Sequence, residues 1–454
     1  MCSIDFSIAN ISFPILTRVF KTELVTVMWV SLAYSLVNIC LLLVMGKISD
    51  LMGRNKIFVI GTAIFTLGLI TVSLAQSIAQ LILFRSFQAI GSAMIISCGP
   101  AIILDAYPAK ERGKGLGLIG SSVALGFIIG PILGGFLLSW LDWRSIYYTR
   151  APIGIIITLL SLVLLKKDRI SAGKLRFDLM GTITSSSGLF FLIFGVSQIS
   201  RFGLGSPSVH IMIGTGVLIL IVFIWIEHRV EDPILDLSLF KNRVFSLSML
   251  SLFLIFLSYP VHTLIMPFYL MKGLGLSPSE TGFLLSVTAM TMVIVSPASG
   301  SLSDRFGPAP FAAIGVGSSL AAFLFISRFD LQTEIMVIIL VSALLGFGFG
   351  MFGSPNNSTI MGAVPKERTG TTSALIATMR NAGMSLGMAL AGTVYSTSMT
   401  FHKTELIRQG MDTDHAAKLS IPLSFHDSLL VPIFIQVIVT ILCLIPVIRR
   451  RPAP

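Results

Sequence analysis

The chain consists largely of apolar segments about 20 residues long, separated by short stretches that hold most of its charged side chains. A helix of about 20 residues crosses the roughly 30 Å of hydrocarbon in a bilayer. Charged residues make up only 12% of the 454 positions, whereas a soluble domain carries roughly 25%. So few charges cannot keep a surface of this size hydrated. The sequence therefore excludes an ordinary soluble enzyme and predicts an all-α polytopic membrane protein.

Fourteen segments are apolar and long enough to be predicted as transmembrane helices, and an even number places both termini on one side. The first apolar stretch, residues 4–19, would reach only about 24 Å as a helix, so we expect the natural chain to begin upstream of Met1. The predicted spans are residues 1–20, 24–46, 57–77, 79–104, 115–141, 145–165, 179–200, 209–227, 246–270, 280–302, 309–327, 333–362, 370–398 and 428–448.

The distribution of Lys and Arg predicts the orientation. With the N-terminus inside, the inner loops hold 20 of the 32 basic residues and the outer segments hold 10, among them Arg150. Basic residues collect in cytoplasmic loops, so we expect both termini to be cytoplasmic and the protein to lie in the cytoplasmic membrane. The net charge of +11 then reflects topology and implies no nucleic-acid partner. Four aromatic residues are predicted to mark the outer boundary after the fifth span: Trp140, Trp143, Tyr147 and Tyr148.

Two short motifs occur twice. Residues 46–53 (GKISDLMG) return as residues 300–307 (GSLSDRFG), and residues 110–112 (KER) return as residues 366–368. The related copies are separated by eight predicted spans, so they run in the same direction, as in transporters built from two parallel halves. This predicts a six-helix half at residues 1–170, an inserted helix pair at 171–243 and a second six-helix half at 244–454.

The sequence carries no pattern for a metal, a nucleotide or covalent catalysis. The four cysteines and six histidines show no ligand spacing, and there is no phosphate-binding GxxxxGK[ST] loop. We therefore expect no metal and no cofactor, and a protein that is not an enzyme. The expected partners are a small molecule, protons and the lipid bilayer, and the protein is expected to be a monomer.

The repeated loop motif combines glycines with charged residues. Glycines let helices and a short loop approach closely, and an acid near a helix N-terminus beside basic residues can form a charge-assisted latch. The alternative is an ordinary solvated loop. The predicted gating residues are Gly46, Asp50, Gly53, Arg54, Asp105 and Arg112, with Asp304 and Arg305 in the second copy.

The fifth predicted span carries glycines at intervals of four residues. Such glycines form a smooth face that permits close helix contact, and the proline among them removes a backbone hydrogen bond. Bulk on this face is expected to disturb close packing between the two halves, whereas the alternative is generic packing of a membrane helix. The motif comprises Gly126, Gly130, Pro131, Gly134 and Gly135.

Ionisable residues within apolar spans are costly and are typical of functional sites. We predict that Asp5 and Arg85 form a proton-coupling pair, because burial favours a neutral carboxyl group and a nearby cation favours the charged one. Asn10 and Gln88 are predicted to supply hydrogen bonds to Asp5. The alternative is that Asp5 only caps a helix near the inner surface.

Further polar residues within spans are candidates for a substrate cavity. The alternatives are that Arg85 and Arg380 anchor helices through backbone carbonyls and that His262 is a packing residue. The full set of cavity candidates is Asn10, Tyr34, Gln88, His262, Asn356, Asn357, Arg380 and Asn381.

Taken together, these motifs resemble the major facilitator superfamily, and specifically its 14-helix drug:proton antiporters. The matching segments are residues 4–14, 46–54, 81–91 and 126–135, together with Trp143, Arg144, Pro152, Gly154, Pro355, Arg380, Gly383 and Gly387. Leu51, Ala89 and Arg150 stand where the family commonly has a basic residue, a glycine and an asparagine.

The resemblance implies a major facilitator fold with alternating access, in which the first and fourth spans line the central cavity. It also implies export of amphipathic drugs or lipophilic cations in exchange for protons. The alternative function is a facilitator or importer of a small solute on the same fold, without proton antiport.

Overall fold

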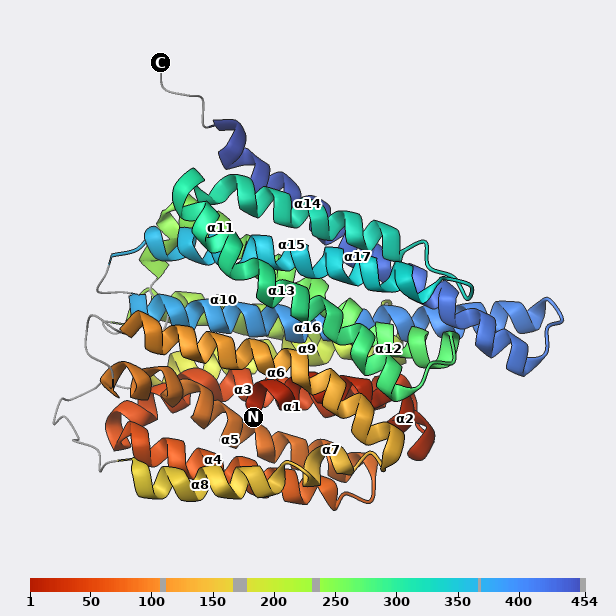
Figure 1. The fold of residues 1–454 in the computed structure, drawn as a ribbon, viewed down its shortest axis with the longest axis horizontal. Coiled ribbons are helices and arrows are strands. Elements are labelled where there is room, and N and C mark those ends of the chain that lie inside the picture. Colours follow the sequence, from red (N-terminus) through yellow and green to blue (C-terminus); the bar gives the residue numbers. More distant parts are fainter. Residues whose placement is uncertain (107–111, 166–177, 231–236, 366–368, 450–454) are drawn as a thin grey trace. The chain divides into compact units, whose positions relative to one another are not determined.

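The computed structural model describes residues 1–106, 112–165, 178–230, 237–365 and 369–449. Two compact units divide the chain, Met1–Leu235 and Asp236–Pro454. The described residues of each unit form helices that lie side by side (Figure 1). The first unit contains α1 (Cys2–Ile11), α2 (Phe13–Val19), α3 (Leu24–Met52), α4 (Arg54–Ser73), α5 (Ile78–Ala106), α6 (Arg112–Trp140), α7 (Ser145–Tyr148), α8 (Ala151–Leu164), α9 (Leu179–Phe202) and α10 (Pro207–Glu227).

The second unit begins with a short 3-10 helix and then contains long helices and two π-helical turns. Its elements are η1 (Leu237–Lys241), α11 (Arg243–Pro260), η2 (Val261–Ile265), α12 (Met266–Phe268), η3 (Tyr269–Gly273), α13 (Pro278–Phe306), α14 (Pro308–Ile326), α15 (Ile335–Gly362), α16 (Thr369–Arg408) and α17 (Thr413–Arg449).

Within the described ranges, twelve helices are long and apolar enough to cross a membrane. The two remaining predicted spans correspond to the α1–α2 pair, which is interrupted at Ser12, and to α16. The predicted count of fourteen is therefore compatible with the structure. The most apolar stretch of α10 is only 17% buried within the described protein, compared with 61% for the stretch in α3.

Helix packing within the units follows one scheme twice. In the first unit α1 packs on α6, α3 on α5, and α4 on α5 and α8. In the second unit α11 packs on α16, α13 on α15, and α14 on α15 and α17. The predicted duplication is thus visible as a repeated set of helix contacts. The inserted pair, α9 and α10, falls in the first unit, where the two helices pack on each other and α9 packs on α3.

The repeated motif at residues 46–53 was predicted as a loop, and this was wrong in form. Helix α3 continues to Met52, Gly53 alone makes the turn at φ 104°, and α4 begins at the next residue. The second copy does the same at Gly307, with φ 87° between α13 and α14. Positive φ is open to glycine and costly for other residues, which explains the glycine at both turns. The other repeated motif, at residues 110–112 and 366–368, is not covered, because Lys110, Glu111 and residues 366–368 lie outside the described ranges.

These turns give a first testable prediction. Gly307→Ala is expected to destabilise the protein by about 1–3 kcal/mol, because alanine would be held in a backbone conformation that L-residues rarely adopt. The matched control is Gly317→Ala in α14, where an added methyl group meets no atom within 4 Å. Thermal unfolding of the purified variants in detergent measures the difference. Equal melting temperatures for the two variants would contradict the prediction.

Residues 401–427 lie between the predicted spans 370–398 and 428–448 and were therefore expected to form an outer loop, but they are mostly helical, so that prediction was wrong. Helices α16 and α17 continue through it as a hairpin that extends beyond the other helices of its unit (Figure 1). Asp427 of α17 accepts hydrogen bonds from Ser398 and from His402 Nε2, the latter at 2.8 Å, and these contacts join the two helices. Because a helix satisfies its own backbone hydrogen bonds, a segment with polar side chains can continue the helix beyond the apolar span.

Candidate functional site

The first unit buries a cluster of charged side chains around Asp5. Its Oδ2 lies 2.5 Å from Nη1 of Arg85, and Gln88 Nε2 donates a hydrogen bond of 3.1 Å to its Oδ1. Gln88 also accepts a hydrogen bond of 2.8 Å from Arg85. All three side chains have 0% exposure. The predicted contact of Asp5 with Arg85 and Gln88 is therefore present, and it joins α1 to α5.

A second guanidinium completes the cluster, although it was not predicted to belong to the site. Arg150, directly before α8, places Nη2 2.8 Å from Asp5 Oδ1. Its Nε donates to the carbonyl of Ile146 at 2.6 Å, and the residue is 2% exposed. Arg150 was predicted to be a charge of an outer segment, but its side chain is buried against Asp5 inside the first unit. The one sequence signal was the basic residue where the family commonly has asparagine.

Two tyrosines lie against the guanidiniums. The ring of Tyr34, in α3, has its centroid 4.2 Å from the Arg85 guanidinium carbon. The centroid of the Tyr147 ring, in α7, lies 5.7 Å from the guanidinium carbon of Arg85 and 5.8 Å from the guanidinium carbon of Arg150. Aromatic faces attract cations at such distances. Tyr34, predicted as a cavity residue, thus contacts Arg85, and Tyr147, predicted at the membrane boundary, lies against both guanidiniums.

The aromatic group after α6 is divided between surface and interior. Trp140 and Tyr148 lie on the surface, at 75% and 43% exposure. Trp143 and Tyr147 are buried inside the first unit, at 2% and 0% exposure. Tyr147 follows Trp143 by four positions, which puts both on one face of the local helical turns, and that face packs inward.

The glycine ladder of α6 holds α1, and with it Asp5, in place. A Cβ atom at Gly126 would lie 2.7 Å from Ser3 Cβ, and one at Gly134 would lie 2.6 Å from Ile8 Cγ1. Between them, a Cβ at Gly130 would overlap Ser7 Oγ. The ladder also includes Pro131 and Gly135, within a continuous helix. Close contact is thus observed, as the motif predicted, and the contacting helix lies in the same unit.

Asn10 does not reach Asp5, contrary to the prediction. Its Oδ1 accepts a hydrogen bond of 3.2 Å from Ser31 in α3. Asn10 lies five residues beyond Asp5, about 140° further round the helix at 3.6 residues per turn, so the two side chains point in different directions. Asn10 therefore joins α1 to α3 instead of supporting the carboxylate.

The candidates in the second unit are dispersed over several elements. His262 is 3% exposed in the π-helical turn η2, and its Nε2 lies 3.1 Å from Thr288 Oγ1. Asn356 donates a hydrogen bond of 3.1 Å to the Ser248 carbonyl, so it connects α15 to α11. Arg380 in α16 lies 6.0 Å from the ring of Phe256. Asn357 and Asn381, in α15 and α16, are partly buried. These contacts form no single network among the described atoms.

The predicted gating residues occupy helix ends. Gly46 and Asp50 belong to the last turns of α3, Arg54 begins α4, Asp105 is near the end of α5 and Arg112 begins α6. In the second unit, Asp304 and Arg305 are exposed on the last turn of α13. The predicted gating residues therefore lie at or beside helix ends in both units.

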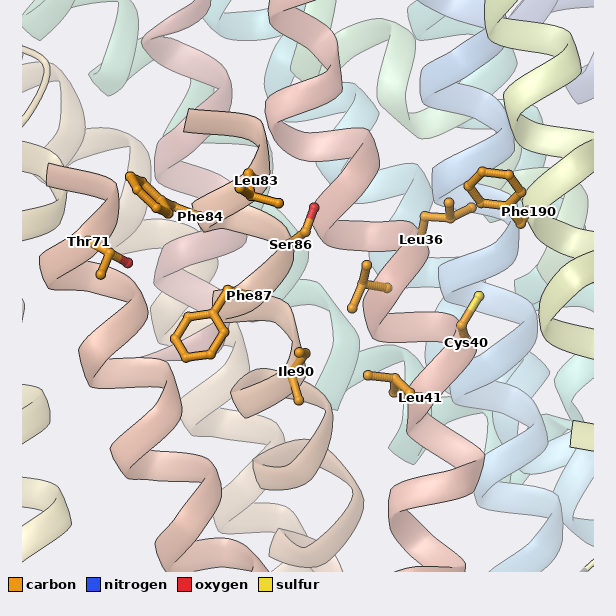
Figure 2. A pocket seen from close by; sticks show the side chains of 11 residues that line it. Leu36, Cys40, Leu41, Thr71, Leu83, Phe84, Ser86, Phe87, Ile90 and Phe190 are labelled. Atoms are coloured by element: carbon orange, nitrogen blue, oxygen red, sulfur yellow. The ribbon is translucent and has the colours of Figure 1, made fainter. Parts of the chain in front are cut away.

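An apolar groove of about 720 Å³ lies on the first unit, apart from the charged cluster (Figure 2). It is lined mainly by α3 and α5, with Phe190 of α9 at one side and Thr71 of α4 at the other. No charged side chain lines it. Among the described residues there is also no group of three or more His, Cys, Asp or Glu side chains that could hold a metal ion.

The fold and the sequence together decide the family. Residues 1–388 match the model of the Major Facilitator Superfamily. The chain belongs to this superfamily. Like other members, it is a membrane transporter and consists of transmembrane helices. The chain is 30% identical over 406 residues to the riboflavin transporter RibZ of Clostridioides difficile, a match that covers 89% of this chain and 87% of that protein.

Other relatives carry names that refer to drugs. The multidrug resistance protein Stp of Mycobacterium tuberculosis is 29% identical, over 87% of this chain and 73% of that protein. Among solved structures, a bacterial homolog of the human lysosomal transporter Spinster, in an inward-facing conformation, superimposes with a TM-score of 0.72. It is 15% identical, with 99% of this chain and 96% of that chain covered, and it supports the fold alone.

Proposed function

We propose that the protein exports amphipathic organic compounds across the cytoplasmic membrane in exchange for protons, with Asp5 as the group that binds and releases the proton. The observation that carries this proposal is the fully buried contact of Asp5 with Arg85 and Arg150. A buried carboxylate is costly unless it is paired, so the protonation state of Asp5 is linked to the helices that supply its partners.

The link works through helix packing. With Asp5 ionised, its two ion pairs join α1 to α5 and to the start of α8. A proton on Asp5 removes the negative charge and with it the attraction that joins these helices. Proton binding and release would therefore shift the balance between two arrangements of the same helices, which is what alternating access requires. The gating turns at Gly53 and Gly307 lie at helix ends, where such movements would be transmitted.

The direction of transport is taken from relatives. Several relatives have names that refer to multiple drugs, such as the multidrug resistance protein Stp and the multidrug transporter MdtP of Bacillus subtilis. Such names favour export of foreign organic compounds. The apolar groove and the aromatic side chains of the first unit suit amphipathic molecules, because aromatic and apolar surfaces bind them with little geometric demand.

A second candidate function is solute transport without proton antiport, and the second arginine favours it. An anionic solute would bind best to guanidiniums that Asp5 has released, and Asp5 releases them when it is protonated. Proton and anion would then favour each other's binding, which is the linkage expected of movement in the same direction. The riboflavin transporter among the relatives is compatible with either mode.

Purified protein in proteoliposomes with an internal pH indicator separates the two candidates. For antiport, we expect that an imposed proton gradient drives the compound across the membrane and that the compound dissipates the gradient. Asp414→Asn, at an exposed acid in α17, is the control and should behave as wild type. Protons that follow the compound, or transport that ignores the gradient, would contradict antiport and support the second candidate.

A further inference from the structure

The cluster around Asp5 has more positive than negative charge. Asp5 contributes one carboxylate, whereas Arg85 and Arg150 each contribute a guanidinium, and all three are at most 2% exposed. An arginine is not neutralised by losing its proton in a protein. One positive charge therefore stays without a counter-charge among the described side chains that contact these groups. An uncompensated buried charge is costly, so its presence calls for a ligand that offsets it.

The polar atoms left without a partner around these guanidiniums can all donate hydrogen bonds, and the two arginine nitrogens among them can only donate. Arg85 Nη2, Arg150 Nη1 and the hydroxyl groups of Tyr34 and Tyr147 are buried and have no hydrogen-bond partner among the described atoms. The acceptors nearby are already used: Gln88 Oε1 and the Val30 carbonyl accept from Arg85. A site with surplus donors and surplus positive charge is complementary to a group with several acceptor oxygens and a negative charge.

We infer that Arg150, together with Arg85, binds an acidic group of the transported compound, such as a carboxylate, and that Arg150 excludes lipophilic cations. This inference rests on transport at the proposed site and deepens the second candidate function, because an anion bound to these guanidiniums favours a protonated Asp5 and so favours movement of the compound and the proton in the same direction. A guanidinium presents paired N–H groups that match a carboxylate. Tyr34 and Tyr147 add ring faces beside the guanidiniums, so the acidic group is expected on a planar aromatic compound.

Arg150 decides the net charge of the cluster around Asp5. With an uncharged asparagine at position 150, Asp5 and Arg85 would form a neutral pair. A permanent cation could then approach Asp5 without meeting a second guanidinium. With arginine, the cation adds a third positive charge to a desolvated cluster, and like charges repel strongly there. The residue therefore converts a site suited to cations into one suited to acids.

Binding measurements on the full-length protein in detergent test the inference, and they do not depend on proton coupling. The probes are naphthalene-2-carboxylate, its methyl ester and trimethyl(2-naphthyl)ammonium. Wild type is expected to bind the carboxylate at least tenfold more tightly than the ester. It is expected not to bind the ammonium compound. In Arg150→Asn the carboxylate should lose at least tenfold in affinity, and the ammonium compound should begin to bind.

Two further variants keep the test decisive. Arg201→Asn removes an exposed guanidinium at the end of α9 and should leave all three affinities unchanged. Arg150→Lys keeps the positive charge but lacks the paired N–H groups of a guanidinium, so it should bind the carboxylate with intermediate affinity. This variant keeps the test possible if the asparagine variant does not fold. The inference is overturned if wild type binds the ammonium compound as tightly as the carboxylate or if the carboxylate does not bind. It is also overturned if the affinity for the carboxylate is the same in wild type and in the variants at position 150. Carboxylate binding without proton movement in proteoliposomes would contradict proton coupling alone.

Discussion

Asp5→Asn is expected to abolish proton-driven transport and to lower the stability of the folded protein. Asparagine keeps the shape of the side chain but cannot carry the proton or the negative charge. Two buried guanidiniums, Arg85 and Arg150, would then lose the carboxylate that both contact. Breaking a buried ion pair by removing one partner costs about 3–5 kcal/mol. Thermal unfolding in detergent measures the stability, and gradient-driven flux in proteoliposomes measures the coupling.

A double variant separates the two effects of this substitution. Asp5→Asn combined with Arg150→Asn leaves only one buried guanidinium, which Gln88 and the Val30 carbonyl still contact. This variant should regain part of the lost stability but none of the proton coupling. If Asp5→Asn transports with wild-type dependence on the gradient, another acid carries the proton. Asp105 is the next candidate.

Gly130→Leu is expected to prevent transport because it displaces α1 from α6. Even a Cβ atom at this position would overlap Ser7 Oγ and would lie 3.2 Å from the Ile4 carbonyl. Overpacking costs about 1–3 kcal/mol for added methylene groups, and here the neighbour includes backbone that cannot rotate away. Because α1 carries Asp5, a displaced α1 would also break the ion pairs with Arg85 and Arg150. Transport assays together with thermal unfolding measure both consequences.

The matched control is Gly214→Leu in α10, where an added Cβ meets nothing within 4 Å. It should transport normally. Gly130→Ala is expected to be impaired less than the leucine variant, and Ser7→Gly should restore part of its activity by removing the overlapping hydroxyl group. Normal flux through Gly130→Leu would show that α1 does not need this contact.

Several properties of the protein could be read from local patterns. Apolar length and low charge predicted the membrane helices, because the bilayer imposes a minimum length and an uncharged composition on each span. The repeat of residues 46–53 at 300–307 predicted the duplication that the helix contacts show. The rarity of ionisable residues in spans singled out Asp5 and Arg85, which do form an ion pair.

Other features could not be predicted from local patterns. The glycines and charged residues at positions 46–53 suggested a loop, whereas only Gly53 leaves the helical conformation. The polar composition of residues 401–427 suggested a loop, whereas helices α16 and α17 continue through it. In both places helix ends are set by backbone hydrogen bonds and by a single glycine or turn, and composition reports these poorly.

The sequence by itself determined the class of protein, the helices, the duplication and the polar pair at the centre of the first unit. Only the tertiary structure decided that Arg150 and Tyr147 join this pair, while Asn10 turns away to Ser31. The physical reason is that hydropathy and spacing act within one helix, whereas these contacts join five separate elements. Which side chains meet depends on how each helix is rotated about its own axis, and the glycines that allow close approach set that rotation through packing. The charge of the site, and with it the expected substrate, follows from that packing.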